Sequence, residues 1–172
     1  MDIKFWTGLS LLLIAIIGGL WLLCEERRKK NPNPKTSMSF REGLNLTGFP
    51  IVTFTNNDKV FTFLLDTGSN VSLINKSVLG SMSFENAASE IDLVGLDGIE
   101  RTGKIITTYL SYDNISYRAC FVVTDLSPTF SQIKKEHGVT LHGILGSDFF
   151  KAYEYILDFE KLIAYSKMTE KK

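Results

Sequence analysis

FTFLLDTGSNVSLI, residues Phe61–Ile74, consists of two apolar segments joined by one polar turn. Apolar residues on both sides of a Gly-containing turn indicate two short buried strands that meet there. The turn places the carboxylate of Asp66 among apolar neighbours, where an unpaired charge costs several kcal/mol. The hydroxyls of Thr67 and Ser69 and the backbone N–H groups beside Gly68 are the nearest donors that could stabilise it. The segment therefore predicts a functional carboxylate held in a tight turn.

A second apolar motif follows about eighty residues later, with the sequence Gly143-Ile144-Leu145-Gly146-Ser147-Asp148-Phe149-Phe150. Together with the Asp-Thr-Gly-Ser turn, it resembles the paired motifs of retropepsin-like (retroviral-type) aspartic proteases, and the order of the two motifs is similar. The resemblance covers Ser39–Lys167. It implies an all-β fold, a closed acid-protease barrel with short helices. The structural alternative is that Asp66 only caps a turn, as Asp before Gly often does.

The resemblance also implies roles for individual residues. Asp66 would be the catalytic carboxylate, supported by three turn residues: Thr67, Gly68 and Ser69. In particular, Thr67 would brace paired turns and the Ser69 hydroxyl would hydrogen-bond near the carboxylate. Three residues of the second motif would pack under the turn: Ile144, Leu145 and Gly146.

Hydrolysis by an aspartic dyad needs two carboxyl groups that share one proton. This chain contains a single Asp-Thr-Gly, and neither Asp97-Gly98 nor Asp148-Phe149 lies in an equivalent Thr-Gly turn. We therefore expect a homodimer in which each chain contributes Asp66 and an extended peptide is the substrate, with no cofactor. The rival interpretation is a catalytically silent, membrane-anchored domain of the same fold that serves binding or assembly.

Composition excludes several other classes of function. The chain has 172 residues, 44% of them apolar, and a formal net charge of zero. A neutral chain argues against nucleic acid as the main partner, because phosphate binding needs a clustered basic surface. Cys24 and Cys120 form no disulfide framework, and His137 and His142 lack neighbours at ligand spacing, so no metal site is expected.

The N-terminal segment predicts a single-pass membrane anchor at residues 1–24. Phe5–Leu23 contains no charge and has Trp6 and Trp21 near its ends, and a helix of that length nearly spans a hydrocarbon core of about 30 Å. A cleaved signal peptide is the alternative, but Trp21-Leu22-Leu23 offers no small residues for cleavage. A basic and Pro-containing linker, residues 25–38, comes next. Its Lys and Arg residues favour a cytoplasmic domain, although an N-terminal anchor can also translocate the domain attached to it.

The protease-like domain is expected at residues 39–167, with a polar tail at 168–172. Alternating apolar patterns predict strands at Phe40–Leu46, Ile51–Thr55, Lys59–Leu65, Ile91–Leu96, Thr102–Leu110, Ile115–Asp125, Leu141–Leu145, Tyr155–Phe159 and Leu162–Ser166. Start and stop signals predict helical segments at Ser77–Leu79, Ser127–His137 and Ser147–Tyr153.

The hairpin around Asp97-Gly98 is expected to be a flap that closes over the substrate, with Gly95 adding freedom to move. An ordinary surface hairpin fits the same pattern. Cys120 is expected to pack in the core. Four apolar residues are candidates for lining the substrate cleft: Phe61, Phe63, Ile99 and Ile105.

Overall fold

The structure of the chain is a computed structural model that describes residues 37–94 and 100–166. The predicted anchor at residues 1–24, nearly all of the linker and the predicted flap tip at Gly95, Asp97 and Gly98 lie outside these residues. Within the described residues, no helix combines the length and hydropathy needed to cross a membrane.

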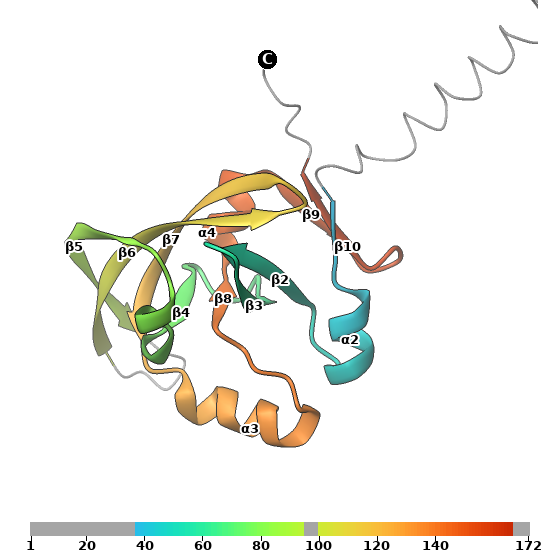
Figure 1. Cartoon of the computed structure of the whole chain (residues 1–172), viewed down its shortest axis with the longest axis horizontal. Helices are drawn as coiled ribbons and strands as arrows, with labels where there is room; N and C mark the ends of the chain where they lie inside the picture. The colour runs from blue at the N-terminus through green and yellow to red at the C-terminus, as the bar shows by residue number, and fades with distance from the viewer. Residues whose placement is uncertain (1–36, 95–99, 167–172) are drawn as a thin grey trace, which may run out of the picture. The chain divides into compact units, whose positions relative to one another are not determined.

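Six of the described strands form a closed barrel (Figure 1). In order around the ring they are β2 (Ile51–Asn56), β3 (Lys59–Leu65), β8 (Gly143–Leu145), β4 (Leu73–Asn75), β7 (Ile115–Thr124) and β6 (Glu100–Tyr112). The ring closes where Thr55 of β2 pairs with Ser111 of β6, and β5 (Glu85–Val94) pairs with the part of β6 from Glu100 to Thr107. The predicted all-β barrel is confirmed.

The short strand β8 brings the two sequence motifs together. It pairs parallel to β3, with Leu65 opposite Leu145, and antiparallel to β4, with Leu73 opposite Ile144. The strands on both sides of the Asp66 turn therefore border the same central strand. This pairing joins segments that are far apart in the sequence.

The barrel interior is rich in aromatic side chains. Phe61 and Phe63 are 2% and 0% exposed, and the ring of Phe63 stacks on Phe121 at 5.4 Å between centroids. The prediction that Phe61 and Phe63 line the substrate cleft is therefore wrong. Successive side chains of a strand point to opposite faces, and in β3 these two positions face the core while Thr62 and Leu64 are less buried.

The same alternation corrects the prediction for Cys120, which is exposed. Its neighbours Ala119 and Phe121 are 2% and 0% exposed and occupy the core-facing positions of β7. A cysteine between two core residues of one strand must point to the opposite face. The prediction of a buried Cys120 is wrong for this reason.

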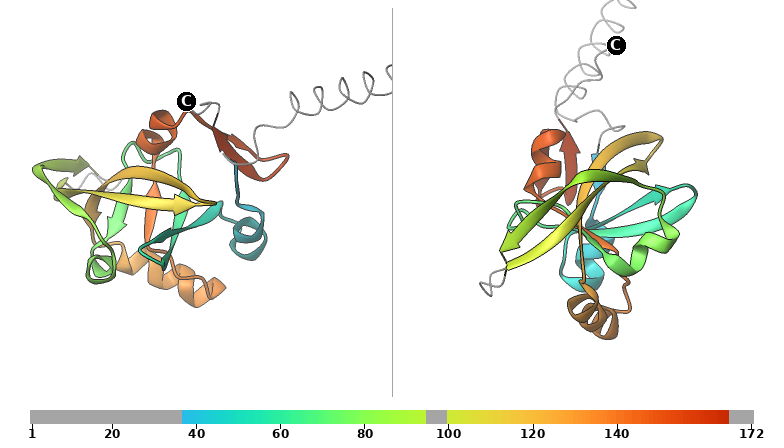
Figure 2. Two further views of the ribbon diagram at one scale, coloured as in Figure 1. Left: turned by 45° about the horizontal axis from the view of Figure 1, so that its top comes forward. Right: turned by 90° about the vertical axis from the view of Figure 1, so that its left-hand side faces the viewer.

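A second, smaller sheet lies at one side of the barrel (Figures 1 and 2). It consists of β1 (Ser37–Ser39), β10 (Ile163–Ser166) and β9 (Tyr155–Asp158), all antiparallel. Tyrosines connect it to the barrel: Tyr155 donates a hydrogen bond of 2.9 Å to the Tyr117 hydroxyl. Burial raises the pKa of both phenols, so both stay neutral.

The predicted strand at Phe40–Leu46 is wrong, because Arg41–Thr47 forms the helix α2. The helix ends at Gly48, whose φ of 76° suits a left-handed cap. A side chain on Gly43 would lie 2.6 Å from Cβ of Ile51, so the glycine permits close contact between α2 and β2. This tertiary packing overrides the alternating apolar pattern of the segment.

The remaining helices match their predictions closely. The 3₁₀ helix η2 (Lys76–Ser81), α3 (Ser127–His137) and α4 (Ser147–Ala152) lie where the sequence predicted helical segments. The N-cap of α3 is Leu126, and the helix ends at Gly138, whose φ is 73°. In each of the three ribbon views, α4 and α3 lie at opposite ends of the barrel (Figures 1 and 2).

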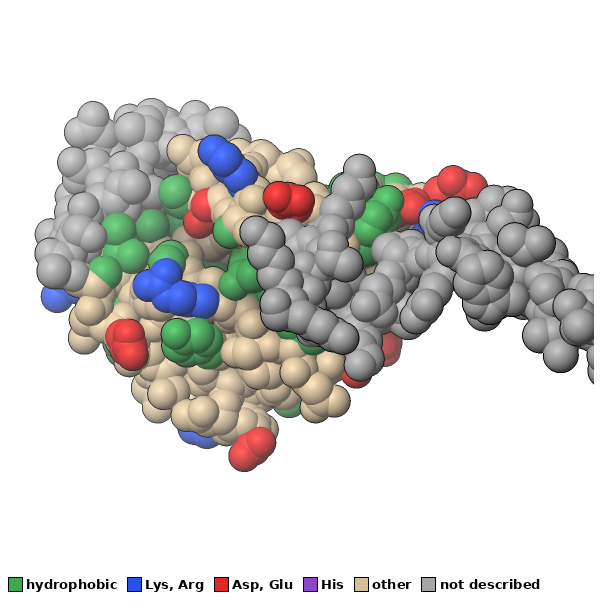
Figure 3. All heavy atoms as spheres, turned by 90° about the horizontal axis from the view of Figure 1, so that it is seen from above, with side chains coloured by type: hydrophobic (Ala, Val, Ile, Leu, Met, Phe, Trp, Pro, Cys, Tyr) green, Lys and Arg blue, Asp and Glu red, His purple; other side chains and the backbone are tan. Residues whose placement is uncertain are grey.

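The described surface shows no concentration of charge of one sign on the face in Figure 3, where acidic and basic side chains are interspersed. Among the described residues, four large apolar side chains are more than half exposed, on α2, β3, β6 and the turn after β9: Leu46, Val60, Tyr109 and Phe159. Scattered apolar residues of this kind are normal for a folded domain.

Candidate active site

Asp66 follows the last residue of β3, and backbone hydrogen bonds fix its position. Its N–H donates to the carbonyl oxygen of Leu145 at 3.0 Å, and its own carbonyl accepts the Ser69 N–H at 3.3 Å. The carboxylate oxygen Oδ1 accepts the Gly68 N–H at 2.9 Å. The turn therefore both orients the side chain and ties it to the second motif.

The other carboxylate oxygen, Oδ2, accepts no hydrogen bond from the residues that the structure describes. The side chain is partly buried, whereas Thr67 and Gly68 at the tip of the turn are exposed. One side of the carboxylate is thus fixed by its own chain and the other is open. An oxygen left open in this way can bind water, substrate or a second carboxyl group.

The residues after Asp66 stabilise the turn through hydrogen bonds to backbone carbonyl groups. The Ser69 hydroxyl donates to the Val71 carbonyl at 2.7 Å. This differs from the expectation that the hydroxyl would bond near the carboxylate; the Ser69 N–H, not its hydroxyl, contacts Asp66. The Thr67 carbonyl accepts the Ser147 hydroxyl at 2.9 Å, while the Thr67 side chain is exposed.

The second motif packs directly beneath the turn. The Ser147 N–H donates to the Ser69 carbonyl at 2.8 Å. A side chain on Gly146 would lie only 2.5 Å from the Val71 carbonyl oxygen, so only glycine fits this position without displacing backbone. Leu145 is fully buried in the core and Ile144 is partly buried. The structure thus brings Ile144, Leu145 and Gly146 together with the Asp66 turn.

The sequence analysis did not predict the structural roles of two residues of this assembly, Ser72 and Asp148. Ser72 is 1% exposed; its hydroxyl accepts the Gly146 N–H at 3.0 Å and donates to Asp148 Oδ1 at 2.7 Å. The same oxygen of Asp148 accepts the Phe149 N–H at 2.8 Å. Asp148 therefore locks the two motifs together. The available signal was a hydroxyl in an apolar segment, because a buried Ser needs a partner.

The β5–β6 hairpin extends beyond the barrel. Its backbone pairs from Glu85 opposite Thr107 to Val94 opposite Glu100, with an irregularity between Asn86 and Glu90. The pairing of β6 with β7 begins only at Ile105, opposite Val122, so the end of the hairpin pairs only within itself among the described residues. This is the geometry of an arm that projects from a barrel, and the predicted flap tip joins its two strands.

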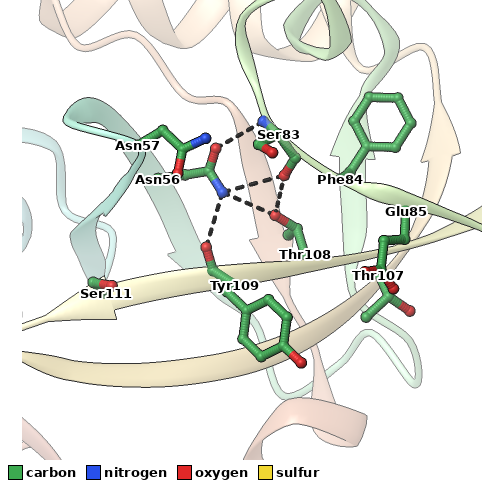
Figure 4. A pocket seen from close by; sticks show the side chains of 9 residues that line it. All are labelled: Asn56, Asn57, Ser83, Phe84, Glu85, Thr107, Thr108, Tyr109 and Ser111. Atoms are coloured by element: carbon green, nitrogen blue, oxygen red, sulfur yellow. Dashed lines mark hydrogen bonds between the residues drawn. The ribbon is translucent and has the colours of Figure 1, made fainter.

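The two described cavities lie away from Asp66. One, of about 190 Å³, surrounds Asn56 at the junction of β2 and β6 (Figure 4). The other, of about 360 Å³, lies between η2 and α3. Asp66 lines neither of them.

Comparison with known proteins agrees with the geometry. No curated protein shows significant similarity to the chain. The family model described as aspartyl protease matches residues 52–149, more than half of the chain, and the match includes the Asp66 turn and the Gly146 motif. The chain therefore belongs to the aspartyl protease family.

Proposed function

We propose that this protein is an aspartic endopeptidase that works as a homodimer, with one Asp66 from each of two chains. The observation that carries the proposal is the half-satisfied carboxylate: Gly68 holds Oδ1, while Oδ2 has no partner among the described residues. Asp148 is already bonded to Ser72 and to the Phe149 N–H, so it is a poor candidate for the second catalytic group.

The chemistry follows from placing two such carboxyl groups side by side. At about 3 Å the two cannot both ionise, so one pKa rises and the other falls. The ionised group takes a proton from the attacking water while the protonated group polarises the scissile carbonyl. The two copies of Asp66 titrate as one unit. No other reactive group is required.

A two-fold axis between the turns fits the exposure of the tip. In a single chain, Thr67 and Gly68 are exposed although they lie next to the partly buried Asp66. A symmetric contact would bury the same residues of both chains. In the proposed dimer Thr67 braces the paired turns, as the family resemblance implies.

The substrate is proposed to be an extended peptide segment. The β5–β6 arm and the turn would hold the peptide as an added strand, with backbone hydrogen bonds for affinity and side-chain pockets for specificity. The flap role of Gly95, Asp97 and Gly98 remains part of this proposal. The buried positions of Phe61 and Phe63 remove them from the specificity pockets.

The N-terminal segment is proposed to anchor the protein in a membrane, with the domain on the cytoplasmic side. The support is the uncharged sequence Phe5–Leu23 and the basic residues that follow it. Tethering two domains to one surface raises their effective concentration, so a weak dimer could assemble there. Juxtamembrane segments of other proteins would then be within reach of the active site.

The catalytic role is tested with the full-length chain in detergent, using a peptide library at acidic and neutral pH. Asp66→Asn should lower turnover by about 10²–10⁴-fold, because the amide cannot exchange the catalytic proton. Asp58→Asn is the matched control: it makes the same chemical change in an exposed turn, at φ 63° where Asn is well tolerated. Equal cleavage by wild type and Asp66→Asn would contradict the proposal, and a folded but inert wild type would favour the non-enzymatic interpretation.

A further inference from the structure

The larger cavity, between η2 and α3, is separate from the active-site turn. It has a volume of about 360 Å³, within the range of small-molecule sites. Its lining comes from the end of β4, from η2 and α3, and from the segment that precedes β8. The active-site turn contacts the start of α4, which lies at the opposite end of the barrel from α3 (Figures 1 and 2). We refer to this space as the α3 cavity.

His142 lines the α3 cavity and carries a hydrogen-bond donor without a protein partner. Its Nδ1 atom accepts the Thr62 N–H at 2.9 Å, so in the neutral ring the proton lies on Nε2. Burial lowers the pKa of the imidazole, which favours this neutral form. Nε2 donates to no acceptor among the described residues.

Asn75 provides a second free donor. The residue is 6% exposed, and its Oδ1 accepts the Leu126 N–H at 3.2 Å and the Ser127 hydroxyl at 3.4 Å. These two donors fix the orientation of the amide, because only its oxygen can accept them. The Nδ2 group has no hydrogen bond to any described residue. Among the described residues no fully buried side-chain polar atom lacks a hydrogen bond, so Nδ2 reaches solvent, where water or a ligand can accept from it.

The residues that line the α3 cavity carry positive charge only. Lys134 is the charged residue among those that line it, and the lining includes no carboxylate. The other polar residues of the lining are mainly serines and a threonine, while Val78, Phe130 and Leu141 form an apolar wall. A lining that contains a cationic side chain and two N–H donors without protein partners favours an oxyanion. The apolar wall suits a small organic group that carries the oxyanion.

We propose that the α3 cavity binds a small organic oxyanion, with its carboxylate or phosphate group on Asn75, Lys134 and His142. The site does not depend on Asp66 or on the dimer. Its ligand would contact the chain next to β8, since His142 directly precedes that strand and its carbonyl accepts the Asn75 N–H at 2.9 Å.

The proposal is tested by NMR on the full-length chain in detergent, with resonances observed for the Asn75 side-chain amide and the His142 ring. Phenyl phosphate and benzoate are titrated separately, with inorganic phosphate and benzyl alcohol as the charge-only and apolar-only comparisons, all at constant ionic strength. Saturable shifts of both side chains with at least one of the two organic anions, and weaker or absent binding of both comparisons, are expected. Non-saturating shifts, or equal effects of benzyl alcohol, would overturn the proposal.

Two neighbouring lysines on α3 provide a matched pair. Lys134→Gln should weaken binding about tenfold, because it removes a charge-assisted hydrogen bond. Lys135→Gln removes the same charge from the same helix but does not line the cavity, and it should change affinity little. Equal weakening by the two substitutions would indicate general electrostatic attraction of the anion to the protein surface and would contradict the proposed site.

Asn75→Asp provides an independent test. The substitution keeps Oδ1, which accepts from Leu126 and Ser127, and replaces the free donor with a negative oxygen. Binding should fall by more than the tenfold expected for Lys134→Gln, since the new charge repels the anion. Unchanged binding would overturn the assignment. If this variant fails to fold, the lysine pair still decides the question.

Discussion

Asp66 and Asn56 are both polar side chains set into an apolar barrel, but they differ in how their hydrogen bonds are completed. Asn56, 5% exposed, donates to the Thr108 hydroxyl and to the carbonyls of Ser83 and Tyr109, and accepts the Ser83 N–H (Figure 4). Asp66 accepts one bond at Oδ1 and none at Oδ2 from the described residues. The hydrogen bonds of Asn56 are thus completed within the fold, whereas those of the proposed catalytic group, Asp66, are left open.

This contrast predicts a large loss of stability on substitution of Asn56 and a small change on substitution of Asp66. Asn56→Ala should lower the free energy of unfolding by about 3 kcal/mol, because it strands buried donors and acceptors on Ser83 and Thr108. Asp66→Asn should change it by less than about 1 kcal/mol, since the amide oxygen can still accept the Gly68 N–H. Denaturant unfolding of the full-length variants measures both values. A large loss of stability in Asp66→Asn would mean that the carboxylate is structural.

A smaller loss of stability is expected at Ser72, a buried polar residue that supports the Asp66 turn. Ser72→Ala removes the acceptor of the Gly146 N–H and the donor to Asp148, so it should cost about 1–2 kcal/mol of stability. It should also lower turnover, because the hydrogen bonds that hold the second motif beneath the Asp66 turn are lost. Ser69→Ala, which removes a hydroxyl bonded only to the nearby Val71 carbonyl among the described residues, is the comparison and should cost less. Equal costs for the two substitutions would contradict the assigned role of Ser72.

The smallest effect is a pH dependence from His142. Burial holds the pKa of the folded-state imidazole below its ordinary value of 6.5, so the unfolded chain binds the proton more readily. The stability contribution of this residue is therefore full above pH 6.5 and is lost as the pH falls below it. His142→Gln should lose less stability than wild type between neutral and mildly acidic pH. Thermal unfolding at a series of pH values measures the difference, and parallel curves would contradict the assignment.

The sequence was informative where a single segment determines the local structure. The Asn57-Asp58 turn between β2 and β3, the glycine that ends α3 and the strands beside Asp66 follow from neighbouring residues alone. The sequence also identified the two motifs, because each combines apolar segments with a polar or glycine position that those segments do not explain.

The features that could not be predicted depend on contacts between distant segments. The bond between Ser72 and Asp148 joins residues on different elements, and neither residue alone indicates the other. The helix α2 depends on the packing of Gly43 against Ile51. The exposure of Cys120 depends on which alternate positions of β7 face the core, and an apolar environment on both sides of it in sequence does not reveal that.

The dimer itself is tested most directly by mixing active and inactive chains. Wild type and Asp66→Asn are co-expressed and purified together, so that mixed dimers form during assembly, with Asp58→Asn as the mixing control. If each site needs two copies of Asp66, turnover per wild-type chain falls in proportion to the wild-type fraction, to about half in an equal mixture. In the Asp58→Asn mixture, turnover per total chain stays at the wild-type value. Turnover per wild-type chain that stays constant in the presence of Asp66→Asn would show that one chain suffices and would contradict the proposed shared site.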